Sequence, residues 1–151
     1  MWFSELFEEW RGFHQPGNPD EYPDEVCRGD NIFSLGVAPD DLYEHCQNYL
    51  NTSGVSLMQL KRFMNFLKEN QGNPDAMLTV YRGQPSKILE YCSWVTPFKS
   101  YAMNYAYDGD HTSKNSKVYK FKVRLHDISC DLDSLAEWGY FGKKVTGVEV
   151  R

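Results

Sequence analysis

The chain has 151 residues, of which 41% are hydrophobic and 25% charged, a balance that predicts an ordinary globular protein folding as one domain with its own core. Its formal net charge of −5 argues against nonspecific binding to nucleic acid or anionic membranes and permits a basic protein partner. Because no run of about 18 apolar residues occurs and the acidic first residues lack the basic start of a signal peptide, we expect a cytoplasmic protein without a membrane span.

The first half of the chain, residues 1–75, is predicted to be helical with loops. Apolar residues at helical spacing (Phe3, Leu6, Phe7 and Trp10) predict a short amphipathic helix. Residues 14–31 carry three prolines and two glycines and are predicted to form a loop. Pro39, with two aspartates after it and Gly54 beyond the end, predicts a second helix.

A third helix is indicated after residue 55. Ser56 and Gln59 have the spacing of a capping box, in which each side chain bonds the backbone N–H of the other residue. Gly72 and Pro74 end the pattern. The helix carries one apolar stripe, which we interpret as core: Leu57, Leu60, Phe63, Met64 and Leu67.

The second half, residues 76–151, is predicted to be rich in strands with one helix. Strands are expected over 77–82 and 92–96, and Thr96-Pro97 opens a helix. Within residues 117–125, apolar and basic residues alternate from Tyr119 to Leu125, which predicts a half-buried strand, and the tail predicts a last one. No linker separates the halves, so we expect a single α+β domain over 1–151, with a helical part (1–75) packed on a small mixed or antiparallel sheet (76–151).

Most familiar catalytic patterns are missing from the chain. The histidines and cysteines, among them His45, Cys46, His111, His126 and Cys130, show no metal-ligand spacing, so no metal site is expected. The cysteines form no C-x-x-C pair and are expected to be reduced thiols. Neither a nucleophile elbow nor a phosphate-binding glycine loop occurs.

One ordered set of short motifs remains in the second half. A strand ends in Tyr81-Arg82-Gly83, and a second strand ends in Thr96-Pro97. The helix that follows contains Ala102 and Tyr105-Ala106, and a glutamate comes late. Over roughly residues 77–150, this order resembles the ADP-ribosyltransferase fold, especially its small phage-type and toxin-type members.

The resemblance implies a role for each motif. Arg82 would hold NAD⁺ near its ribose and phosphates, since a guanidinium offers a fork of donors to a pyrophosphate. Gly83 would let the nicotinamide amide reach the backbone, and the Thr96 hydroxyl would position the catalytic acid. Trp94 or Phe98 could stack on the nicotinamide ring. The resemblance also makes Tyr105 a candidate cofactor contact.

The late glutamate has two candidates, Glu137 and Glu149. Its carboxylate would stabilise the positive charge that develops on the ribose as the N-glycosidic bond breaks. Neither candidate has the second acidic or amide residue that commonly stands two positions earlier. We favour Glu137 because aromatic residues and glycines surround it in the sequence; Asp131 and Asp133 rank behind.

Each motif also has a purely structural interpretation. Arg82 could pair with a carboxylate at a strand end, and Thr96 could simply cap the helix. The resemblance predicts a mono-ADP-ribosyltransferase that uses NAD⁺ as substrate and modifies a protein, such as a phage or mobile-element effector. The alternatives are an inactive relative that binds and inhibits a host protein as an anti-defence factor, and an NAD⁺ glycohydrolase.

Overall fold

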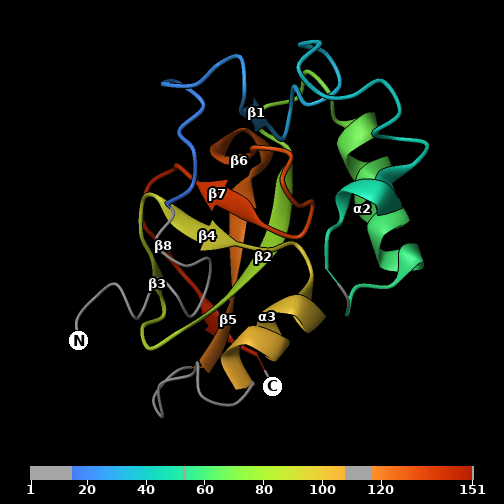
Figure 1. The fold of residues 1–151 in the computed structure, drawn as a ribbon. Helices are drawn as coiled ribbons and strands as arrows, with labels where there is room; N and C mark the ends of the chain where they lie inside the picture. Colours follow the sequence, from blue (N-terminus) through green and yellow to red (C-terminus); the bar gives the residue numbers. More distant parts are fainter. Residues whose placement is uncertain (1–14, 53, 108–116, 151) are drawn as a thin grey trace.

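The computed structural model describes residues 15–52, 54–107 and 117–150, and only the backbone of residues 105–107. Over these ranges the chain is a mixed α+β structure in which two α-helices accompany three antiparallel sheets (Figure 1). The α+β class expected from the sequence is confirmed. No helix within the described ranges is long and apolar enough to cross a membrane.

The longest two strands, β2 (Met77–Gln84) and β5 (Lys117–Arg124), pair along their whole length, and β9 (Val148–Glu149) adds a third strand beside β5. The predicted alternation is confirmed, since Phe121 and Val123 are buried while Lys120 and Lys122 on the opposite face are exposed. A second sheet has the order β1 (Cys27–Arg28), β6 (Ile128–Cys130), β7 (Trp138–Tyr140) and β4 (Ser93–Val95). The third sheet pairs β3 (Ile88–Leu89) with β8 (Val145–Thr146).

One bridge connects the two larger sheets. Tyr81 of β2 and Thr96, directly after β4, exchange both backbone hydrogen bonds, at 2.7 and 3.0 Å. The strands β7, β4 and β2 are therefore neighbours in this order. Figure 1 shows β4 crossing towards β2 in the middle of the molecule. This junction sets the position of the candidate site.

Two helices pack beside the sheets. Helix α2 (Leu57–Glu69) has the predicted capping box, in which Ser56 Oγ accepts from the Gln59 N–H at 3.1 Å. Its stripe is buried except for Leu57, which is 50% exposed. Helix α3 (Lys99–Tyr107) packs against β2 and β5. Phe63 anchors α2 in the core, because its ring forms T-shaped contacts with the rings of Phe98 and Trp138, both at a centroid distance of 5.5 Å.

Among the described residues of the first half, 15–52 and 54–75, α2 is the one α-helix and the rest is mostly turns and loops, so the structure does not show the expected helical half. The proposed helix after Pro39 is instead a series of turns with one short 3₁₀ helix, η1 (Cys46–Tyr49). Leu42, Cys46 and Leu50 are buried as helical spacing requires, but weak helix formers surround them and the backbone follows tighter i→i+3 bonds. The helix predicted over residues 3–10 lies outside the described residues.

Several strands were missed or misjudged because they are very short. β1, β6 and β7 have two or three residues each, too few to show a period. Another 3₁₀ turn, η3 (Leu125–Asp127), separates β5 from β6. The predicted last strand is split into β8 and β9 at Gly147, where an added Cβ would lie 2.5 Å from Phe121 Cε1.

Candidate functional site

Arg82 occupies the last part of β2 on the same face as two core residues. Leu78 and Val80 are buried, and alternate strand residues share a face. The Arg82 guanidinium donates from Nη1 to the Trp94 carbonyl at 2.7 Å and from Nε to Gln84 Oε1 at 2.8 Å. Burial lowers the pKa of Arg82 to about 10, which still leaves the side chain protonated at neutral pH. The chain thus holds a fixed cation against the backbone of β4.

Thr96 and Glu137 lie at the same end of the β4–β7 ladder. Trp94 pairs with Gly139 and Val95 with Trp138; Thr96 directly follows this last pair on one side, and Glu137 directly precedes it on the other. Thr96 is fully buried, and its Oγ1 accepts from the Phe98 N–H at 3.2 Å. This contact closes a turn before α3, which begins only at Lys99. Thr96 therefore lies before the helix and is not its N-cap, contrary to the capping interpretation.

Glu137 is only 7% exposed and directly precedes β7. The Tyr101 hydroxyl of α3 donates to Glu137 Oε2 at 2.5 Å, in a contact that is buried on both sides. A short hydrogen bond to a carboxylate is of the charge-assisted kind. The contact joins residues 36 positions apart, so local sequence spacing could not predict it.

The three motif strands are adjacent, but their side chains do not all share one face. β4 lies between β7 and β2. Tyr81 and Thr96 form a direct pair and so face the same way, whereas Arg82, next to Tyr81, points to the opposite face of β2. Arg82 reaches β4 through a carbonyl two residues before Thr96.

The second glutamate candidate, Glu149, shares the face of Arg82. Tyr119 of β5 pairs with Arg82 on one side and with Glu149 on the other. Two strand spacings of about 4.8 Å separate the backbones of Arg82 and Glu149. The Glu149 carboxylate lies 3.6 Å from Lys117 Nζ in a partly exposed pair, a contact of small energetic value.

The candidate cofactor contacts have different environments. Phe98 is 3% exposed and packs on Phe63 in the core, which leaves no open ring face for stacking. Gly83 pairs with Val118 at the far end of the β2–β5 ladder. Tyr105 lies in α3, but its side chain is outside the described residues. Trp94 is mostly buried and lines a cavity.

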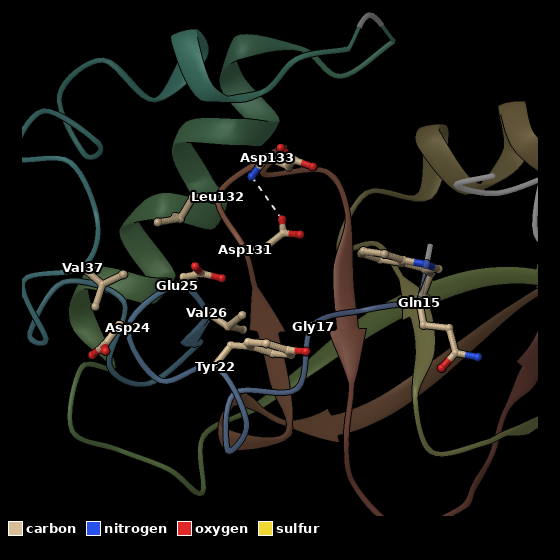
Figure 2. Close-up of a pocket in the computed structure, with 11 residues that line it drawn as sticks. Gln15, Gly17, Tyr22, Asp24, Glu25, Val26, Val37, Asp131, Leu132 and Asp133 are labelled. Carbon is tan, nitrogen blue, oxygen red and sulfur yellow. Dashed lines mark hydrogen bonds between the residues drawn. The ribbon is translucent and has the colours of Figure 1, made fainter. Parts of the chain in front are cut away.

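This cavity, of about 590 Å³, lies between the loop of residues 15–26 and the segment after β6. Figure 2 shows the side chains of Tyr22, Glu25 and Asp131 gathered around it. Arg82, Thr96 and Glu137 do not line it. Four carboxylates contribute to its wall, a charge that disfavours a pyrophosphate there: Asp24, Glu25, Asp131 and Asp133.

The described residues contain neither a metal-ligand cluster nor a disulfide. No three His, Cys, Asp or Glu side chains gather there in a way that could hold a metal ion; His111 lies outside the described residues. The four cysteines form no disulfide, and burial raises the pKa of the Cys27 thiol. A raised pKa keeps the thiol protonated and unreactive.

Comparison with models of protein families, with curated proteins and with solved structures finds no match for the chain. The function is therefore argued from the residues and their geometry.

Proposed function

We propose that the protein is an NAD⁺-dependent mono-ADP-ribosyltransferase that modifies a protein. The observation that carries the proposal is the adjacency of three strands, β7, β4 and β2. Glu137 directly precedes β7, Thr96 directly follows β4, and Arg82 lies in β2. These are the residues to which the motif resemblance gives the catalytic roles, and they come from segments that are 14 and 41 positions apart in sequence.

The chemistry assigned to this site is the transfer of one ADP-ribose unit. The bond between nicotinamide N1 and ribose C1′ breaks, and nicotinamide leaves with the electron pair. A nucleophilic side chain of the acceptor then bonds C1′ and releases its proton to water. The Glu137 carboxylate would stabilise the cationic ribose, while Arg82 would hold the pyrophosphate. Water in place of the acceptor gives the NAD⁺ glycohydrolase variant of the same proposal.

The experiment is incubation of the purified protein with NAD⁺ carrying a label on its adenosine part, alone and with cell extract. We expect nicotinamide release and a labelled acceptor protein. Arg82→Lys keeps a charge but loses the fork of donors, so it should raise the KM for NAD⁺ at least tenfold, a loss of about 1.4 kcal/mol in binding. Equal KM values for wild type and Arg82→Lys would show that Arg82 does not contribute to NAD⁺ binding.

A second candidate function is supported by the burial of the same residues. Thr96 is fully buried and Glu137 is held by Tyr101 beneath α3, an arrangement that also suits a scaffold whose carboxylate serves stability alone. On this proposal the protein binds and inhibits a partner protein without chemistry. Tight partner capture that survives Arg82→Ala, together with the absence of nicotinamide release by wild type, would favour it over the enzyme.

A further inference from the structure

A second cavity, of about 740 Å³, lies at the end of β5 beside the turn that follows β7. Lys122 and Arg124 of β5 line one side, and Phe141 and Lys143 of the turn line the other. Its size falls within the range of about 300–1,000 Å³ that is usual for small-ligand sites. None of the residues assigned to NAD⁺ takes part in it.

The charge of this cavity is opposite to that of the chain. Its lining has three cations (Lys122, Arg124 and Lys143) and one carboxylate (Asp127), a net of +2 in a protein of net −5. The Arg124 guanidinium is already engaged in ion pairs, because it donates to both oxygens of Asp127 at 3.1 Å and to Asp75 at 3.2 Å. Lys122 and Lys143 are exposed and form no ion pair within the described residues. Their ammonium groups are therefore available to an anion.

An exposed aromatic ring is held at the same place. Tyr91 lines the cavity and is 57% exposed. Its hydroxyl nevertheless accepts from Asn18 Nδ2 at 3.2 Å, and its ring meets Phe141 at a centroid distance of 5.4 Å and an angle of 82°. A ring fixed by two distant segments loses little conformational entropy when a flat ligand stacks on it.

The turn that carries Lys143 is also fixed. A Cβ on Gly142 would lie 2.5 Å from the Tyr140 hydroxyl and 2.8 Å from Asp127 Oδ2. The glycine thus lets the turn pack directly on the Arg124–Asp127 pair. This packing keeps Lys143 and Lys122 on the rim of one cavity instead of on separate surfaces.

We propose that this cavity binds a nucleotide, with its phosphate between Lys122 and Lys143 and its base against Tyr91 and Phe141. Lysine supplies a point charge suited to phosphate, and stacking on an aromatic ring tolerates any base. The site is one of binding alone and is separate from the Arg82 site. The nucleotide can come from the free pool or from a single-stranded nucleic acid, which share this chemistry.

The test is a titration of the labelled protein with AMP, adenosine and a short single-stranded oligonucleotide, followed by amide NMR shifts and calorimetry. AMP should shift residues 141–143 and bind at least fivefold more tightly than adenosine. The double variant Lys122→Gln/Lys143→Gln should weaken AMP binding by about fivefold to tenfold, since each lost charge near the surface costs a few-fold. Tyr91→Ala should weaken AMP and adenosine alike.

The matched control is Lys120→Gln/Lys144→Gln, which removes two neighbouring lysines outside the cavity lining and should leave AMP affinity unchanged. Arg82→Gln should leave the AMP-induced shifts of residues 141–143 unchanged, whatever its effect on NAD⁺ chemistry. Tighter binding of the oligonucleotide than of AMP identifies a strand as the source, and equal or weaker binding identifies the free nucleotide. The proposal is overturned if AMP shifts no residue around the cavity, if both double variants lose affinity equally, or if Arg82→Gln abolishes the shifts of residues 141–143.

Discussion

The contact between Tyr101 and Glu137 gives the sharpest stability prediction. Tyr101→Phe removes one hydroxyl and leaves the Glu137 carboxylate, 7% exposed, without the donor that lies 2.5 Å from Oε2. A hydrogen bond to a charged group contributes about 1.5–3 kcal/mol. We therefore expect the free energy of unfolding to fall by roughly 1.5–3 kcal/mol, which corresponds to a drop in Tm of about 3–12 °C for a chain of this length.

Urea unfolding at neutral pH, followed by far-UV circular dichroism, measures this loss. Glu137→Gln is the companion variant, because its amide oxygen can still accept from Tyr101. In the double variant Tyr101→Phe/Glu137→Gln, the effect of the phenylalanine should shrink, since a neutral acceptor gives up less than a carboxylate does. Tyr119→Phe serves as the matched tyrosine control on β5. A change of less than about 0.5 kcal/mol for Tyr101→Phe, the range of an ordinary surface substitution, would refute the reasoning.

Three further predictions concern the fold. Gly147→Ala should destabilise the protein by about 1–3 kcal/mol in the same urea assay, as overpacking against Phe121 forces the β8–β9 junction to shift; unchanged stability would show that the junction is loose. Ser56→Ala removes the capping box of α2 and should cost about 1 kcal/mol, a loss that Ser56→Asp should largely avoid. Burial raises the pKa of Tyr140 from 10.0 to about 12. The unfolded chain therefore loses this proton first, so stability should fall as pH rises from about 10 to about 12. Tyr140→Phe should reduce that fall, and an identical pH profile in the variant would contradict the assignment.

The sequence predicted the elements whose signals are local and repeated. Helix α2 was predicted from a capping box and a five-residue stripe, and β5 from the alternation of apolar and basic residues that begins at Tyr119. The turns after Pro39 were mistaken for a helix because proline and aspartate, which favour the first turn of a helix, also favour isolated turns.

The sequence predicted where some residues of the candidate site lie, but not which partners they contact. The strand-end position of Arg82 and the turn at Thr96 follow from local residue order. The partners of these residues do not, because the Trp94 carbonyl and the Tyr101 hydroxyl reach their partners through tertiary packing. The pairing that brings Thr96 and Glu137 to one end of the same ladder depends on β7, a strand of three residues with no detectable period.

The most direct test of the central claim is the rate of nicotinamide release from NAD⁺ by wild type, Glu137→Gln and Glu149→Gln at equal folded concentration. The proposed site predicts measurable release by wild type, a loss of about 10²–10³-fold for Glu137→Gln, as for removal of one charge-stabilising group, and little change for Glu149→Gln. No release by wild type, or a loss confined to Glu149→Gln, would contradict the assignment of Glu137 as the catalytic acid.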